Sequence, residues 1–161
     1  MTLLGAPRIP DVQPITPFLT RSFRIEWGQC DPAGIVFAPR YFDMFTENTI
    51  MLFEKAGLPR KREMLEQMGV SGYPMVDVSA RFLRPTSYGD EVVIETAAPV
   101  FGNSSFTVDH RLLLAGEVCV ECTEENRRTY RNMLFTTPGL GEFISGVILF
   151  DETIRQNSID G

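Results

Sequence analysis

The second half of the chain carries apolar residues at every second position, in segments joined by very short links. Val76, Val78, Ala80 and Phe82, for example, fall on one face of a strand that starts near Pro74. Further strands are predicted over residues 91–100, 104–114 and 117–132, with turns at 85–89, 102–103 and 115–116. Antiparallel strands can be joined by turns this short, whereas parallel strands need a crossover of a dozen or more residues. This half is therefore predicted to fold as an antiparallel β-meander.

One long helix precedes the meander. It is expected to run from about Pro39, a residue that suits the first helical turn, to Ala56, just before the stop signal Gly57-Leu58-Pro59. Its apolar arc is wider than a helix at the surface needs, which predicts that a sheet encloses it. A first strand is predicted over residues 19–27 and a short helix over 60–68. The predicted fold class is α+β, with one curved antiparallel sheet around a long central helix.

The length of 161 residues and the hydrophobic content of 43% suit one domain with a substantial core. Residues 1–17 are rich in proline and are predicted to form a flexible N-terminal arm, so that residues 18–161 make up the single domain. The longest stretch without an ionisable side chain runs from Thr96 to Val108, well short of the roughly 20 residues that a spanning helix needs. No membrane span is therefore expected.

Charge and cysteine usage exclude further classes of protein. The 15 Lys and Arg against 21 Asp and Glu give a net charge of −6, which argues against nucleic acid as a partner. Three cysteines do not suit a secreted disulfide framework, and the first 17 residues lack the basic start and apolar core of a signal peptide. A cytoplasmic location is expected. Because His110 is the only histidine, a zinc site built from several histidines is excluded, and no metal or cofactor is expected.

The segment that bears most directly on function runs from Gly28 to Tyr41 and reads GQCDPAGIVFAPRY. Its Asp-Pro-Ala-Gly part is by itself a common turn sequence, and Asp31 alone could serve only to shape that turn. The longer pattern adds Ile-Val and then Pro-x-Tyr at the start of an apolar helix, followed by the β-meander. This combination resembles the hotdog-fold acyl-CoA thioesterases, specifically the 4-hydroxybenzoyl-CoA thioesterase family. The resemblance extends over roughly residues 20–132 and implies a hotdog fold.

Thioester hydrolysis is the activity that the resemblance implies. Asp31 matches the catalytic acid of the family, which would act as a general base on water or as a nucleophile through an anhydride, and both roles remain open. The thioester carbonyl would lie at the start of the helix, where free N–H groups and the helix dipole stabilise developing negative charge. Ala38 occupies the matching amide position, and only its N–H is needed there.

Eight residues are expected to bind substrate: Phe37, Tyr41, Thr46, Asn48, Thr49, Tyr73, Arg127 and Arg131. Asn48 and Thr49 are polar but lie towards the enclosed side of the helix, so they either line the acyl pocket or are satisfied buried groups. Arg127 and Arg131 share a strand face and could hold the phosphates of CoA. Residues 60–62 form an alternative basic run, and a solvated charged face is the simpler interpretation of both.

The acyl group and its carrier are left open. Where close family members have a basic cluster for the CoA nucleotide, this chain has the uncharged residues 102–104, and Thr46 and Tyr73 replace the family's contacts to the ring hydroxyl. An aromatic or medium-chain acyl-CoA is the expected substrate, with a carrier-protein thioester as an alternative. A non-catalytic subunit that binds an acyl ligand is a further alternative. The resemblance also implies a homo-oligomer, a dimer or a tetramer, because the site of these thioesterases lies between two subunits.

Two other features have a simpler structural interpretation. His110 shares a strand face with Phe106 and Val108, so a packed core residue is favoured over a catalytic base, and a hotdog dehydratase would need its histidine near the helix start. Cys119 and Cys122 form a C-x-x-C pair, but residues three apart on a strand should point to opposite faces. Redox or metal chemistry is therefore not expected of them.

Overall fold

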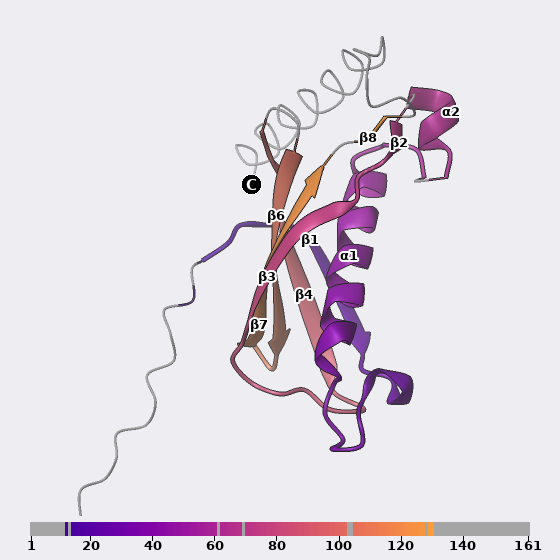
Figure 1. Ribbon diagram of the computed structural model, residues 1–161. Coiled ribbons are helices and arrows are strands. Elements are labelled where there is room, and N and C mark those ends of the chain that lie inside the picture. Colours follow the sequence, from indigo (N-terminus) through magenta and orange to yellow (C-terminus); the bar gives the residue numbers. More distant parts are fainter. Residues whose placement is uncertain are drawn as a thin grey trace, which may run out of the picture.

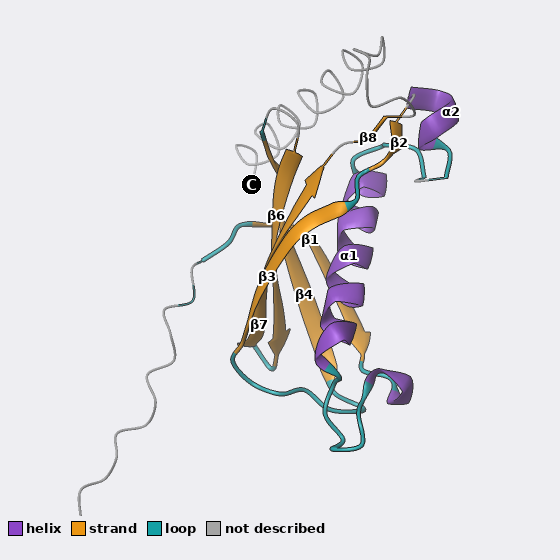
Figure 2. Cartoon of the chain, viewed as in Figure 1, coloured by secondary structure: helices purple, strands orange, loops and turns teal. Residues whose placement is uncertain are grey.

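The structure, a computed structural model, describes residues 12, 14–60, 62–68, 70–102, 105–127 and 129–130. Figure 1 shows their arrangement and Figure 2 their secondary structure. The elements in chain order are β1 (Pro17–Arg24), the short 3-10 helix η1 (Trp27–Gln29), α1 (Ala38–Lys55), α2 (Met64–Met68), β2 (Val70–Gly72), β3 (Met75–Phe82), β4 (Glu91–Ala97), β5 (Val100–Phe101), β6 (Ser105–Leu114), β7 (Glu117–Arg127) and β8 (Thr129–Tyr130).

The main sheet is antiparallel and has the strand order β1-β4-β6-β7-β3, with β5 paired to β6. β2 and β8 form a separate two-stranded pair. The turn between β6 and β7 consists of Ala115 and Gly116, both with positive φ, as a two-residue hairpin requires. The pairing of β4, β6 and β7 confirms that part of the predicted meander. The predicted hairpin between β3 and β4 is wrong, because residues 83–90 form a link long enough for β3 to pair with β7 at one edge of the sheet, while β1 forms the other edge.

Helix α1 lies along one face of the sheet (Figure 2). Its buried residues point towards the strands, and they are Tyr41, Met44, Phe45, Asn48, Thr49, Leu52 and Phe53. The opposite side of the helix is exposed and charged, with Asp43, Glu47 and Glu54. Burying the apolar stripe against a sheet stabilises the helix far more than its intrinsic propensity does. Long helix and curved antiparallel sheet together confirm the predicted hotdog architecture.

The boundaries of several predicted elements shift by a few residues. The strand predicted over 91–100 is interrupted after Ala97, because Pro99 has no N–H to donate to the ladder. The strand predicted over 117–132 ends at Arg127, and Thr129–Tyr130 pair with β2 instead. The short helix predicted over 60–68 is confined to Met64–Met68. None of these shifts changes the topology.

The prediction that Cys119 and Cys122 point to opposite faces is wrong. Both thiols are buried in the same hydrophobic cluster on the helix side of the sheet. The register between β6 and β7 shifts between Leu112 and Leu113, which face Val120 and Val118, so Cys119 is an extra residue in a β-bulge. Burial raises the pKa of both thiols, that of Cys122 to about 12, which leaves them unreactive.

Candidate active site

The loop between β1 and α1 folds back on itself as a tight hairpin. The N–H of Asp31 donates to the carbonyl of Ile35 at 2.9 Å, and the N–H of Phe37 donates to the carbonyl of Gln29 at 2.9 Å. Gly34 closes the hairpin with a φ of +82°, a conformation that favours glycine. The Val36 N–H donates to the Thr86 carbonyl at 2.8 Å and ties the hairpin to the body of the protein. Asp31 is therefore held close to the first turn of α1.

The carboxylate of Asp31 is only partly committed to the turn. Its Oδ1 accepts a hydrogen bond from the Ala33 N–H at 2.8 Å, the contact that an aspartate makes when it shapes a turn. Its Oδ2 has no partner among the described residues, and the side chain is half-buried. One carboxylate oxygen thus shapes the loop, and the other is available to a ligand.

The start of α1, which directly follows this hairpin, offers a free hydrogen-bond donor. Phe37 precedes the helix and its side chain makes no capping hydrogen bond. Within the described residues, the N–H of Ala38 donates to no other group, and Pro39 has no N–H. The Phe37 side chain is 51% exposed. The predicted pair, Asp31 and Ala38, therefore lies at one end of the molecule with an apolar side chain beside it.

Tyr41, predicted to contact substrate, supports the loop from inside. Its side chain is buried, and its hydroxyl lies 2.8 Å from the Thr86 Oγ1 and accepts from the Thr86 N–H at 3.3 Å. Burial raises the pKa of the Tyr41 hydroxyl, although the bonds to Thr86 partly offset the shift. Because Thr86 also accepts from Val36, Tyr41 helps to position the hairpin that carries Asp31.

Thr46 and Thr49 meet a buried carboxylate that the sequence interpretation did not single out. Thr46 donates to Oε1 of Glu124 at 3.1 Å, and Thr49 donates to Oε2 of the same side chain at 2.7 Å. Nε2 of His110 lies 3.2 Å from the Thr49 hydroxyl and 3.5 Å from Glu124 Oε2. Glu124 and His110 are fully buried side chains. The alternation Val120-x-Cys122-x-Glu124 could have predicted this buried position, since it places Glu124 on the same inner face of the strand as Val120 and Cys122.

Asn48 extends this buried polar network towards β4. Its Nδ2 donates to the Thr96 hydroxyl at 2.9 Å, and that hydroxyl lies 2.8 Å from Nδ1 of His110. The His110 ring stacks on Phe45 with the ring centres 5.2 Å apart. The interpretation of His110 as a packed core residue is confirmed. Asn48 and Thr49 are both buried and hydrogen-bonded within this network, but Oδ1 of Asn48 is buried without a partner among the described residues.

Glu124 stays ionised despite its burial. Burial is the largest influence and by itself raises the pKa of this carboxyl group, but the hydrogen bond and electrostatic interaction with His110 act against it. The hydroxyls of Thr49 and Thr46 act in the same direction, so the pKa of Glu124 is lowered overall. The network therefore holds a negative charge between α1 and β7.

Tyr73 and Arg127 lie away from Asp31. Tyr73 packs against Phe53 and Phe106, with ring centres 5.0 Å and 5.7 Å away, and burial raises its pKa to about 12. Phe53 and Ala38 are about 22 Å apart along α1, at 1.5 Å per residue. Arg127 is exposed at the end of β7, and Arg131 lies outside the described residues. The predicted binding residues thus do not form one site within the described part of the chain.

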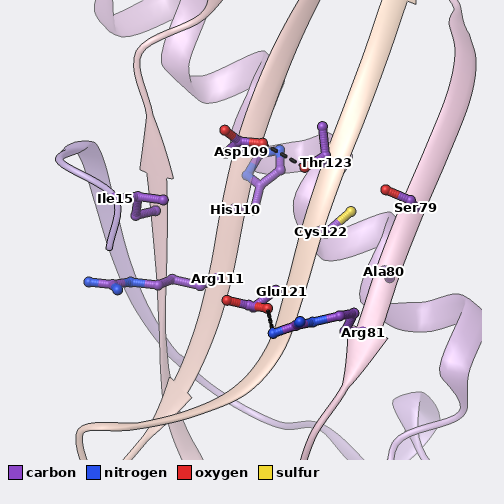
Figure 3. Close-up of a pocket in the computed structure, with 10 residues that line it drawn as sticks. All are labelled: Ile15, Ser79, Ala80, Arg81, Asp109, His110, Arg111, Glu121, Cys122 and Thr123. Carbon is purple, nitrogen blue, oxygen red and sulfur yellow. Dashed lines mark hydrogen bonds and ion pairs between the residues drawn. The ribbon is translucent and has the colours of Figure 1, made fainter. Parts of the chain in front are cut away.

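Figure 3 shows a cavity of about 370 Å³ on the sheet face opposite α1. Its walls carry an ion pair between Arg81 and Glu121 and a hydrogen bond from Thr123 to Asp109. Ile15, which precedes β1, lies over it. None of the predicted catalytic or substrate-binding residues lines this cavity. It is therefore not the candidate active site.

The fold and the hairpin before α1 define a hotdog protein of the thioesterase type, and comparison with known proteins agrees. A family model described as thioesterase-like superfamily matches residues 25–129, and the chain belongs to that superfamily. The 4-hydroxybenzoyl-CoA thioesterase of Pseudomonas sp. (strain CBS-3) is 38% identical over 92 residues, which are 57% of this chain and 65% of that protein. The resemblance inferred from the motif is confirmed.

Solved structures of thioesterases share the fold. The structure of 4-hydroxybenzoyl CoA thioesterase from Pseudomonas sp. strain CBS-3 superposes with a TM-score of 0.69 and 28% identity, covering 80% of this chain and 97% of that one. A gentisyl-coenzyme A thioesterase superposes with a TM-score of 0.63 and 27% identity, covering 70% and 89% of the two chains. Among the described residues, no helix is long and apolar enough to cross a membrane.

The C-terminal part of the chain has a second similarity, which the sequence interpretation missed. A model of class-I fructose-bisphosphate aldolase matches residues 100–161. A chloroplastic fructose-bisphosphate aldolase of Oryza sativa subsp. japonica is 36% identical over 116 residues, which are 68% of this chain and 29% of that protein. The chain thus spans less than two thirds of either curated relative. Most of the predicted single domain lies within the described residues, but residues 131–161 lie outside them.

Proposed function

We propose that this protein hydrolyses an acyl-CoA thioester to the free acid and CoA. The observation that carries the proposal concerns two groups close in sequence. The Asp31 carboxylate has one oxygen without a hydrogen-bond partner among the described residues, and the Ala38 N–H at the start of α1 is free. A thioesterase needs these two groups, a base or nucleophile and a donor for the carbonyl oxygen. Membership of the thioesterase-like superfamily supports the same reaction.

In this reaction the Ala38 N–H donates a hydrogen bond to the carbonyl oxygen and, with the positive end of the α1 dipole, stabilises the negative charge that develops there. Oδ2 of Asp31 either takes a proton from the attacking water or attacks the carbonyl carbon itself. In both routes one water is consumed, the carbon–sulfur bond breaks, and the thiol of CoA leaves with a proton. Phe37 is the exposed apolar side chain that would contact the acyl group.

An aromatic or medium-chain acyl group is the proposed substrate class. Relatives named for 4-hydroxybenzoyl-CoA and gentisyl-coenzyme A support an aromatic acyl group. Thr46 is the half-buried member of the predicted acyl-binding set, and its hydroxyl is oriented by Glu124. Tyr41, Asn48, Thr49 and Tyr73 would act from the interior, by holding α1 and its loop in place.

We also propose a homo-oligomer, a dimer or a tetramer, and a cytoplasmic location. The sheet has two edges, β1 and β3, and exposed edges are surfaces that proteins pair or cover. On β3, Val76 and Phe82 are half-exposed apolar side chains. A second copy against this edge would cover them. The three cysteines are free thiols, which suits a reducing compartment.

Thiol release from a panel of aromatic and aliphatic acyl-CoAs, with Asp31→Asn measured alongside, tests the function. We expect turnover with at least one aromatic acyl-CoA and its loss in the variant. Tight acyl-CoA binding without thiol release would indicate a non-catalytic acyl-binding subunit. Release from an acyl carrier protein but not from CoA would assign the carrier-protein thioester as substrate.

A further inference from the structure

A second cavity, of about 750 Å³, lies between edge strand β1, helix α1 and the turn before β4. Its walls include Arg21 and Arg24 of β1, Trp27 and Gln29 of η1, and Tyr88 of the turn. Of the described residues that line it, none is assigned to the thioester chemistry. The cavity therefore brings aromatic rings and cationic groups together outside the candidate active site.

Trp27 presents an open aromatic face to this cavity. Its side chain is 74% exposed, the largest exposed fraction among the large apolar residues described. The ring of Tyr88 lies 5.8 Å away and nearly perpendicular, at 87°, so it contacts the indole at an edge and does not stack on it. An indole that is so exposed and makes one perpendicular contact leaves at least one flat face for another planar group.

Arg24 is a positioned cation without a counter-ion. Its guanidinium carbon lies 5.1 Å above the centre of the Tyr88 ring. Among the described residues, no carboxylate lies within ion-pair distance of Arg24, whereas Arg21 is paired with Glu47 at 2.6 Å. A guanidinium offers its N–H donors as a planar fork, and a carboxylate accepts two of them in parallel. Arg24 is therefore the group of this cavity that favours an anionic ligand.

Two acidic residues of the lining limit how much negative charge the cavity accepts. Glu26 and Glu47 balance the two arginines in formal charge, and Glu26 has no ion pair among the described residues. Each carboxylate repels a like charge by Coulomb's law, and a ligand with two negative charges is repelled about twice as strongly as one with a single charge. The lining thus favours a carboxylate over a phosphate ester.

We propose that this cavity binds an aromatic carboxylate, a planar ring that bears one carboxylate group. The ring stacks on the indole of Trp27, and the carboxylate accepts two hydrogen bonds from the guanidinium of Arg24. Because Tyr88 contacts both the indole and the guanidinium, the two interactions lie side by side on one wall of the cavity.

The free acid that the proposed reaction releases from an aromatic acyl-CoA belongs to this class of ligand. Gln29 lines the cavity, and its carbonyl accepts the N–H of Phe37 at 2.9 Å, next to the proposed carbonyl donor Ala38. The cavity and the candidate active site thus share one short loop, and the released acid is the ligand that we assign to the cavity. That identity rests on the proposed function, whereas the site itself rests on Trp27 and Arg24.

Trp27 is the only tryptophan of the chain, so its fluorescence reports on this cavity directly. Titration with benzoate should change the emission and saturate. Arg24→Ala should weaken benzoate binding by about tenfold, the scale of one lost charge-assisted contact. Arg84→Ala is the matched control with unchanged affinity, since Arg84 pairs with Glu117 and does not line the cavity. No saturable binding, or equal affinity in Arg24→Ala and the wild-type protein, would overturn the proposal.

Calorimetric titration, which does not depend on the tryptophan signal, separates the two interactions. Trp27→Ala should bind benzoate several-fold more weakly, and the wild-type protein should bind cyclohexanecarboxylate several-fold more weakly than benzoate, because each change removes the ring stack. Phenyl phosphate should also bind more weakly than benzoate, and Glu26→Gln should narrow that gap. Equal affinity for the flat and the saturated ring, or tighter binding of phenyl phosphate, contradicts the assignment to an aromatic carboxylate.

Failure of the proposed function looks different from failure of this site. If benzoate binds and Arg24→Ala weakens it while no aromatic acyl-CoA releases thiol, the thioesterase proposal fails and the carboxylate site stands. If the protein hydrolyses an aromatic acyl-CoA and Arg24→Ala leaves the affinity for the released acid unchanged, the acid binds only at the active site and the inference is wrong. If Asp31→Asn leaves the affinity for the acid unchanged and Arg24→Ala lowers it, the acid occupies the cavity as proposed.

Discussion

Two carboxylates on the two sides of α1 have opposite environments. Asp31, in the loop before the helix, is half-buried and uses one oxygen in a turn, so that its second oxygen has no partner among the described residues. Glu124, on the strand β7 behind the helix, is fully buried and accepts from Thr46 and Thr49 beside His110. Both are acidic residues in a thioesterase-like fold, and burial alone would favour Glu124 as the catalytic carboxylate.

From this difference we infer that the carboxylate of the proposed reaction is marked by an oxygen without a hydrogen-bond partner, and not by burial. Every acceptor oxygen of Glu124 is already engaged, and its lowered pKa reflects that satisfaction. Asp31 engages only Oδ1 in its loop, so Oδ2 has no partner among the described residues. We therefore expect substitutions of Glu124 to act on stability and substitutions of Asp31 to act on turnover.

The largest effect is expected from Glu124→Ala. Removing the carboxylate leaves the buried hydroxyls of Thr46 and Thr49 without their acceptor, and each such loss typically costs about 1–3 kcal/mol. The free energy of unfolding, measured by urea denaturation, should fall by that amount. Glu125→Ala is the matched control, since the neighbouring side chain is not fully buried, and it should change the free energy by less than about 0.5 kcal/mol. Equal effects of the two substitutions would refute the structural role of the network.

Asp31→Asn should lower kcat by at least about a hundredfold, the scale of a lost general base. Its melting temperature should stay close to that of the wild-type protein, because the amide oxygen can still accept from the Ala33 N–H. Asp43→Asn, on the exposed face of α1, serves as the control with turnover near that of the wild type. Near-native turnover of Asp31→Asn would remove the catalytic assignment.

The pH dependence of stability should report on Glu124. Because its pKa is lowered in the folded protein, its contribution is complete above the ordinary pKa of a glutamate and is lost as the pH falls through the folded value. The melting temperature of the wild-type protein should therefore fall on acidification. In Glu124→Gln this acid-side slope should be smaller, and an identical slope in both proteins would contradict the assignment.

The smallest effect is expected at the exposed end of β7. Replacing Arg127 and Arg131 together by alanine should raise KM for acyl-CoA by a few-fold and leave kcat within a few-fold, since phosphate contacts act equally in the ground and transition states. Initial rates over a range of acyl-CoA concentrations measure this. An unchanged KM would move the phosphate site to the basic run at residues 60–62 or favour a carrier-protein substrate.

Much of the architecture could be predicted from the sequence for local physical reasons. Alternation with period two placed β3, β4, β6 and β7, and the two-residue turn at Ala115 and Gly116 required β6 and β7 to be antiparallel. The Gly57-Leu58-Pro59 stop signal ended α1 within a residue of the predicted position. The motif before the helix identified Asp31 and Ala38, because a hairpin and a helix start are both formed by neighbouring residues.

Contacts between residues distant in sequence were beyond such reasoning. Thr46 and Glu124 are separated by 78 positions, and neither residue shows by itself that the two will meet. Likewise, the bulge at Cys119 changes which face a thiol occupies, although alternation predicts otherwise. Arg24, Trp27 and Tyr88 form one cavity only because β1 runs beside β4 and the turn that precedes it.

The sequence by itself determined the order of the elements, the long helix and the loop that carries Asp31, since each of these depends on periodicity, turn residues or a short motif. Only the tertiary structure decided which polar groups are satisfied inside the core and which remain available to a ligand. The physical reason is that hydrogen-bond satisfaction depends on the partner that folding brings within about 3 Å, and for Glu124 and Asp31 that partner environment differs completely.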